Sequence, residues 1–192
     1  MSLRVISGIA KGRKLKSVPG DTTRPVTDRV KEALFNILGG DVVDSSWWDA
    51  FGGTGAVGIE ALSRGAASIR FTDLHRAAVD TIQANLAATG LGSRAEARQA
   101  DALSMLASPP DRRFDYIYIA PPQYHGMWSQ ALALLDDNAG WLSADGWAIA
   151  QIDPKEYEAL DLKSIVEFDQ RKYGTTLLVF YRGSETAVQD DS

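Results

Sequence analysis

The chain has 192 residues, 45% of them hydrophobic and 23% charged, which fits a globular protein with a substantial core. No apolar run approaches the ~20 residues that cross a bilayer, and the first residues lack the layout of a signal peptide, so we expect a soluble, cytoplasmic protein. The absence of cysteine excludes disulfides, thiolate metal sites and cysteine nucleophiles.

Charge is distributed unevenly along the chain. The net charge of −5 argues against nucleic-acid binding by the whole surface. Residues 1–40, however, hold eight basic and three acidic residues, so this segment carries +5 and the remainder carries −10. The asymmetry predicts that a polyanion is met mainly by the N-terminal segment, and an ordinary solvated basic hairpin is the alternative.

Residues 1–40 are predicted to form a small appendage. Two alternating runs, 3–9 and 13–18, are joined by Ala10-Lys11-Gly12, which predicts a β-hairpin with basic side chains on its exposed face. A helix is predicted over residues 28–38, because its apolar residues fall on one face and Thr27 or Asp28 can cap its start. Gly39-Gly40 ends this helix.

From residue 47 onward the pattern alternates between strands and helices. Strands are predicted at 47–51, 69–73, 95–99, 116–120 and 147–152, with helices at 56–64, at 76–89, after Ala102, and at 127–137. Such alternation predicts a parallel sheet covered by helices on both faces.

The end of the chain follows another pattern. Runs 165–173 and 175–181 are separated only by Gly174, which is too short for a crossover, so they must form an antiparallel hairpin. This α/β layout is typical of a Rossmann-like methyltransferase sheet, mostly parallel with a C-terminal antiparallel hairpin, rather than of a dehydrogenase. The predicted core spans 41–183, and 184–192 are expected to be a disordered tail.

A glycine-rich loop follows the first core strand. The run Asp49-Ala-Phe-Gly-Gly-Thr-Gly-Ala-Val-Gly-Ile-Glu60 contains glycines at 53, 55 and 58, which permit a tight turn and let a ligand lie against the backbone near a helix N-terminus. Asp73 ends the next strand, 20 residues after Gly53, where a carboxylate accepts ribose hydroxyls. A tight turn that holds no ligand is the alternative.

Asp49 indicates which of two kinds of ligand, S-adenosylmethionine or a dinucleotide, the loop would bind. It lies four residues before Gly53, where its carboxylate pairs with the ammonium group of S-adenosylmethionine but repels a pyrophosphate. A turn-capping role is the alternative. Asp101 is either an adenine contact or a helix N-cap. The predicted cofactor-binding residues are Asp49, Phe51, Gly53, Thr54, Gly55, Asp73, Leu74, Asp101 and Ala102.

A rigid turn follows the strand predicted at 116–120. In Ala120-Pro121-Pro122-Gln123-Tyr124 the prolines fix the backbone and donate no hydrogen bond, so nearby carbonyls are held as acceptors. This looks like the Pro-Pro-aromatic motif of methyltransferases that act on exocyclic amines, and a structural turn is the alternative. His75 and His125 are too few and too far apart to suggest a metal centre.

Most of the chain resembles the small-subunit ribosomal RNA guanine-N2 methyltransferases. The resemblance rests on Arg4-Val-Ile-Ser-Gly, on Lys11-Gly-Arg-Lys-Leu15, on the stretch from Thr23 to Leu38, and on Ala61-Leu-Ser-Arg-Gly-Ala66 after the glycine loop. It implies an enzyme that transfers a methyl group from S-adenosylmethionine to a guanine amine, without a metal, in ribosomal RNA or the assembling small subunit. We expect a monomer. The resemblance places Thr27, Asp28 and Arg29 near the cofactor and target base, and Arg13, Lys14 and Arg24 on RNA phosphate.

This sequence departs from the family at the Pro-Pro loop. Ala120 stands where the family carries an acidic residue, and Gln123 displaces the aromatic by one place to Tyr124. The lost carboxylate removes a charge-assisted hydrogen bond to the amine, worth roughly 1.5–3 kcal/mol. Backbone carbonyls and Gln123 remain as acceptors, and Tyr124 or Trp128 is left to stack the base. A non-catalytic homologue that binds cofactor or RNA is the leading alternative. A methyltransferase for a protein or small-molecule amine and a nicotinamide-dependent dehydrogenase are the others.

Overall fold

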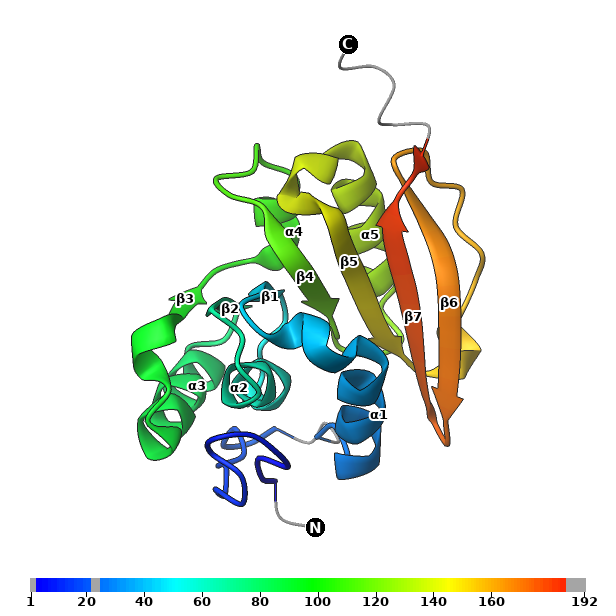
Figure 1. The fold of residues 1–192 in the computed structure, drawn as a ribbon. Coiled ribbons are helices and arrows are strands. Elements are labelled where there is room, and N and C mark those ends of the chain that lie inside the picture. Colours follow the sequence, from blue (N-terminus) through cyan, green and yellow to red (C-terminus); the bar gives the residue numbers. More distant parts are fainter. Residues whose placement is uncertain (1–2, 22–24, 186–192) are drawn as a thin grey trace. The chain divides into compact units, whose positions relative to one another are not determined.

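The computed structural model describes residues 3–21 and 25–185, and the chain divides into two compact units, residues 1–101 and residues 102–192. Each unit contains strands that alternate with helices (Figure 1). Among the described residues, no helix is both long enough and apolar enough to span a bilayer.

The first unit contains three parallel strands in the order β3-β2-β1. Trp47 lies opposite Ile69, and Phe71 lies opposite Ala97. Two helices connect the strands: α2 contacts β1 and β2, and α3 contacts β2 and β3. The elements are β1 (Ser46–Asp49), α2 (Ala56–Ser63), β2 (Ser68–Asp73), α3 (Arg76–Thr89) and β3 (Ala95–Gln99).

Helix α1 (Asp28–Leu38) has the bounds that the sequence predicts. The Thr27 hydroxyl accepts a hydrogen bond from the Val30 amide at 3.3 Å, which satisfies one of the free amides at the helix start. Gly39 ends the helix with a φ of 56°, a conformation that glycine adopts without steric cost. The ring of Phe35 stacks on Trp47 of β1, with centroids 5.7 Å apart.

The N-terminal segment folds back on itself, but its hairpin is shorter than predicted. A single antiparallel bridge joins Arg4 to Lys14, and the amide of Val5 donates to the carbonyl of Arg13 at 2.9 Å. Beyond the bridge, residues 6–10 do not extend as a strand, because the amides of residues 6, 7, 9 and 10 bond to Glu60 and Ser63 of α2. Contacts with α2 therefore replace the cross-strand pairing expected there.

The second unit contains four strands in the order β4-β5-β7-β6. β4 and β5 are parallel, whereas β7 is antiparallel to both of its neighbours, so the predicted C-terminal hairpin is confirmed (Figure 1). Trp147, Phe168 and Phe180 form an aromatic cluster across β5, β6 and β7. The elements are α4 (Ala102–Leu106), β4 (Phe114–Ile119), α5 (Met127–Asp137), β5 (Leu142–Ile152), η4 (Pro154–Glu156), β6 (Ile165–Tyr173) and β7 (Thr176–Gly183).

Strand β5 begins five residues before the predicted start at Trp147. The run that ends at Gly146 resembles a turn in sequence, but it pairs with β4 through a register shift between Phe114 and Tyr116. A Cβ on Gly146 would lie 2.9 Å from the carbonyl oxygen of Phe114, so glycine is needed for a close backbone approach. Of the predicted tail, residues 186–192 lie outside the described part of the chain.

Candidate active site

The glycine loop joins the end of β1 to the start of α2. Its glycines have two structural roles, one in the turn and one in helix packing. Gly53 and Gly55 have φ values of 55° and 78°, so the turn itself requires them. A Cβ on Gly58 would lie 2.2 Å from Ile69 Cδ1, so Gly58 lets α2 pack closely on β2. A Cβ on Gly53 would meet nothing within 4 Å, which leaves its face of the loop open.

Asp49 ends β1 and is 2% exposed. Burial, together with the nearby negative charge of Asp73, raises the pKa of Asp49 to about 8, and a backbone hydrogen bond from Gly58 opposes the shift. Its Oδ1 atom is buried and has no hydrogen-bond partner among the described residues. A buried carboxylate oxygen without a partner is costly, and a cationic donor would satisfy it.

Asp73 ends β2 and holds the glycine loop in place. Its Oδ2 atom accepts from the Gly53 amide at 3.0 Å, and its Oδ1 atom accepts from the His75 amide at 2.9 Å. Each carboxylate oxygen retains a further lone pair for a ligand. Leu74, the next residue, is 61% exposed and offers an apolar surface beside that carboxylate.

Of the other residues predicted to bind a cofactor, Phe51, Thr54 and Asp101 belong to the first unit, and Ala102 belongs to the second. Phe51 and Thr54 are half-buried in the glycine loop, and the Thr54 carbonyl accepts from Asn85 Nδ2 at 2.9 Å. Asp101 is exposed at the end of the first unit, and Ala102 is the buried first residue of α4. The structure brings Asp49, Gly53, Gly55 and Asp73 together within one unit.

These residues fit S-adenosylmethionine. The Oδ1 atom of Asp49, to which no residue in the described part of the chain bonds, suits an ammonium group, and that group would also lower the pKa of the carboxyl. The open face of Gly53 leaves room for a ligand against the backbone, and Asp73 supplies acceptors for two hydroxyls. The same arrangement would repel the pyrophosphate of a dinucleotide.

The Pro-Pro loop lies in the second unit, between β4 and α5. Ala120 and Pro121 are half-buried, and Pro122, Gln123 and Tyr124 are exposed. The expectation that Trp128 is free to stack a base is wrong, because Trp128 is 2% exposed and stacks on Tyr157, with ring centroids 6.4 Å apart. Tyr124 remains as the exposed aromatic of the loop.

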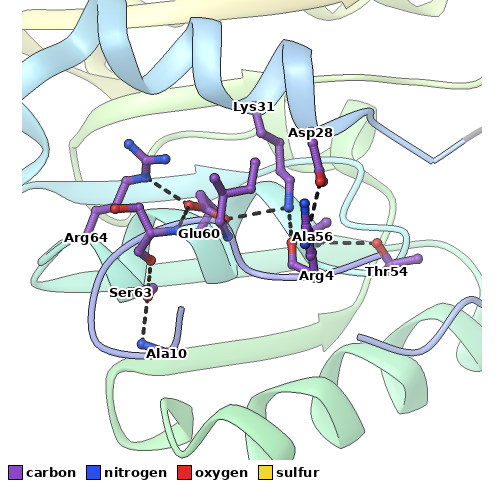
Figure 2. A network of polar contacts seen from close by, with 11 residues as sticks. Arg4, Ala10, Asp28, Lys31, Thr54, Ala56, Glu60, Ser63 and Arg64 are labelled. Atoms are coloured by element: carbon purple, nitrogen blue, oxygen red, sulfur yellow. Dashed lines mark hydrogen bonds and ion pairs between the residues drawn. The ribbon is translucent and has the colours of Figure 1, made fainter. Parts of the chain in front are cut away.

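A buried ion network supports the basic N-terminal segment (Figure 2). Glu60 of α2 and Lys31 of α1 are fully buried, with Nζ and Oε2 3.6 Å apart. Glu60 also accepts from the amides of Ile6 and Ser7 at 2.9 and 3.0 Å, and from Arg64 Nε at 2.9 Å. Burial lowers the pKa of Lys31, although Glu60 and Asp28 oppose the shift.

The residues predicted to meet RNA have two kinds of environment. Arg13, Lys14 and Arg29 are exposed. By contrast, Asp28 pairs with Arg4 at 2.9 Å (Figure 2). Thr27 caps α1, so both residues have contacts within the protein. Arg24 lies outside the described residues.

Several residues that shape this region were not predicted from the sequence. Glu60 could have been noticed as the single charge in the otherwise apolar and small helix Ala56–Ser63. Asn85 is fully buried, and it joins the Lys16 backbone to the Thr54 carbonyl, a contact without a local sequence signal. Asp153 and Glu156 bond to Tyr124 from about 30 residues away, which no spacing rule predicts.

Comparisons with known proteins agree with this description. Residues 3–182 match the sequence model of the family described as "Conserved hypothetical protein 95". The chain is 36% identical to YlbH of Bacillus subtilis (strain 168), named as a candidate rRNA methyltransferase, over 94% of this chain and 98% of YlbH. It is 38% identical to ribosomal RNA small subunit methyltransferase D of Escherichia coli (strain K12), over 73% of this chain and 70% of that protein.

A solved structure supports the fold assignment. The structure of yhhF from Escherichia coli superposes with a TM-score of 0.84 at 31% identity, and covers 96% of this chain and 99% of yhhF. The predicted Rossmann-like methyltransferase fold is therefore confirmed.

Proposed function

Since the chain belongs to the family described as conserved hypothetical protein 95, we propose that it is an S-adenosylmethionine-dependent methyltransferase that acts on ribosomal RNA. The observation that carries this proposal is the buried carboxyl group of Asp49, beside an open glycine loop, whose Oδ1 atom has no hydrogen-bond partner within residues 3–21 and 25–185. The finer proposal is that the acceptor is the exocyclic N2 amine of a guanine in small-subunit ribosomal RNA.

Cofactor binding would use the ends of the first two strands. Asp49 would pair with the ammonium group, and Asp73 would accept the ribose hydroxyls while it keeps the Gly53 amide. Leu74 and Phe51 would give apolar contacts to the adenine, with Asp101 and Ala102 at its exocyclic amine. When bound, S-adenosylmethionine supplies an electrophilic methyl group on a sulfonium.

The Pro-Pro loop would hold the acceptor amine. The carbonyls around Ala120 and Pro121 would accept hydrogen bonds from the amine, which orients the nitrogen lone pair and stabilises the positive charge that develops on it. Gln123 would add an amide acceptor, and Tyr124 would stack the base. This chain needs no nucleophile of its own for such a transfer, because its residues would act by positioning.

RNA would be held by the N-terminal segment. Arg13 and Lys14 are exposed and would meet phosphates, as would Arg24. Thr27, Asp28 and Arg29, at the start of α1, would lie near the cofactor and the target base. Thr27 would do so while it caps the helix, and Asp28 while it pairs with Arg4. The proposed RNA side is thus the appendage at residues 1–40.

Two measurements test the proposal. Calorimetric titration with S-adenosylmethionine should show binding to the wild-type protein and much weaker binding to Asp49→Ala. Mass spectrometry of small-subunit ribosomal RNA should show a methylguanine that disappears when the gene is deleted and returns with the wild-type gene. An unchanged methylation profile after deletion would rule out the guanine proposal, and no cofactor uptake would rule out the methyltransferase.

Ala120 favours a second candidate, a homologue that binds cofactor and RNA but does not methylate. This candidate predicts calorimetric binding of S-adenosylmethionine without methyl transfer, either to protein-free RNA or to assembling subunits. Ala120→Asp tests the role of the loop, because it restores the charge-assisted hydrogen bond and should raise the transfer rate roughly 10–100-fold if the loop holds the amine. No gain would count against this role of the loop.

A further inference from the structure

The Pro-Pro loop contains a residue in a conformation that needs support. Tyr124 has a φ of 64°, in the left-handed region that bulky residues avoid. A residue of this kind stays in such a conformation only when its surroundings fix it. Gly126, which also has a positive φ of 63°, closes the loop before α5 begins.

Two carboxylates in the turn that follows β5 bond to Tyr124. The Tyr124 amide donates to Glu156 Oε1 at 2.6 Å, and the Tyr124 hydroxyl donates to Asp153 Oδ2 at 2.6 Å. Both acids belong to the segment that leaves β5, where Asp153 caps the short helix η4 and Glu156 ends it. The backbone and the side chain of Tyr124 are therefore fixed by one turn.

That turn is itself well anchored. The other oxygen of Asp153 accepts from the Lys155 amide at 2.9 Å, and the Glu156 amide donates to the Asp153 carbonyl at 2.9 Å. The next residue, Tyr157, stacks on Trp128 of α5, and its hydroxyl donates to Glu167 at 2.9 Å. Asp153 and Glu156 consequently present the oxygens that bond to Tyr124 from a fixed position.

The ring of Tyr124 is left facing outward. The residue is 61% exposed even though its amide and hydroxyl are both bonded, so its exposed part is largely the apolar ring. The hydrogen bond to Asp153 raises the pKa of Tyr124 and lowers the pKa of Asp153, which keeps the donor protonated and the acceptor ionised at neutral pH. A rigid, exposed ring is what base stacking requires.

We infer that Asp153 and Glu156 are positioning residues that hold the Tyr124 ring as the stacking platform for the target base. This inference rests on the function proposed above. It accounts for the displaced aromatic of the loop. Gln123 occupies the position where the motif has its aromatic residue, and the left-handed conformation of the next residue, Tyr124, turns the aromatic ring outward. The two acids would act on the base only through Tyr124.

The test combines Tyr124→Phe, Tyr124→Leu and Tyr124→Gly with Asp153→Asn, in methyl-transfer assays on small-subunit ribosomal RNA. Tyr124→Leu should lower kcat/KM roughly 10–100-fold, because stacking is lost. Tyr124→Phe should lower it by a few-fold because the hydroxyl is lost, and Asp153→Asn should lower it by no more than that, because an amide keeps an acceptor oxygen for the hydroxyl but loses the charge. The double variant should be no worse than Tyr124→Phe alone, because the hydroxyl that bonds to position 153 is already gone. Glu156→Gln keeps an acceptor oxygen for the Tyr124 amide and should act weakly, whereas Glu156→Ala should resemble Tyr124→Leu.

Tyr124→Gly separates positioning from folding. Glycine adopts the left-handed conformation freely, so the melting temperature should be unchanged or higher while activity falls as in Tyr124→Leu. The Kd for S-adenosylmethionine should stay at the wild-type value in every variant. Full activity of Tyr124→Leu, or additive losses in the double variant, would overturn the inference while leaving the proposed function standing. If the wild-type protein methylates no ribosomal RNA, both proposals are overturned.

Discussion

The fold buries the carboxyl group of Asp49 away from water. Its pKa of about 8 lies well above the value of an unfolded aspartate, so the folded protein binds a proton that the unfolded chain has already released between pH 4 and pH 8. Stability must therefore fall as the pH rises through this window. The residue that is proposed to bind the cofactor is destabilising at neutral pH.

Asp49→Asn should accordingly stabilise the protein in a pH-dependent way. The variant should gain unfolding free energy on the order of a few kcal/mol at pH 8, and the gain should shrink towards pH 4, where wild-type Asp49 is neutral in both states. Denaturant unfolding at pH 4.5, 6.5 and 8.5 measures the effect. A gain of equal size at all three values would show that the Asp49 charge is not its cause.

Gly8 shows how closely the N-terminal segment lies against α2. A Cβ at this position would lie 1.8 Å from the carbonyl oxygen of Ser63, and φ is 83°. Gly8→Ala should lose roughly 2–4 kcal/mol of unfolding free energy through clash and backbone strain together. Gly12→Ala is the matched control, because Gly12 has the same φ but nothing within 4 Å of its Cβ, so it should lose only about 1 kcal/mol. Equal losses in urea titrations would contradict the close contact.

At the scale of elements, Glu60 links three parts of the first unit. It bonds to the 6–10 segment, to Lys31 of α1 and to Arg64 at the end of its own helix (Figure 2). A buried ion pair often contributes little net stability, but removal of one partner leaves the other charge uncompensated. The network therefore fixes the arrangement of these segments more than it adds to stability.

Glu60→Gln should lower the unfolding free energy by about 3–5 kcal/mol, because fully buried Lys31 loses its counter-charge. Adding Lys31→Met should restore part of the loss. Hydrogen exchange should show faster exchange at the amides of residues 6 and 7 in both variants, since Glu60 is their acceptor. If the double variant is less stable than Glu60→Gln alone, the loss arises from something other than the buried charge.

The elements themselves were largely predictable. Helices α1, α3 and α5 and strands β3 and β6 have the predicted bounds, because periodicity, caps and glycines all act locally in sequence. The glycine loop and the strand-end aspartates were predictable for the same reason. The short hairpin, the early start of β5 and the burial of Trp128 were not, because each depends on a contact with a segment distant in sequence.

At the scale of the whole molecule, the net charge and the charge of the N-terminal segment have opposite signs. The chain is net negative, so the proposed binding of RNA requires a local set of cations. The predicted division at residue 40 remains a prediction about function, since residues 1–101 form one compact unit. If the basic segment binds phosphate, the salt dependence of RNA affinity should report each contact.

Arg13→Ala/Lys14→Ala should reduce the slope of log K against log salt by about 1–2, because each phosphate contact contributes roughly 0.7–0.9. Arg171→Ala/Lys172→Ala is the control, because it removes the same two positive charges from two exposed residues of β6. It should leave the slope near the wild-type value. Fluorescence anisotropy with labelled ribosomal RNA fragments at several salt concentrations measures both. Equal reductions in the two variants would assign the effect to net charge alone.

Asn85 has one consequence for anyone who wishes to shorten or recombine this protein. Its amide spans from the Lys16 backbone to the carbonyl of Thr54, so the glycine loop relies on residues near the start of the chain. A fragment cut at residue 41 would carry the glycine loop without the Lys16 backbone to which Asn85 bonds. The N-terminal segment therefore cannot be removed without loss of a contact that supports the glycine loop. A replacement segment would have to supply an equivalent backbone partner for Asn85.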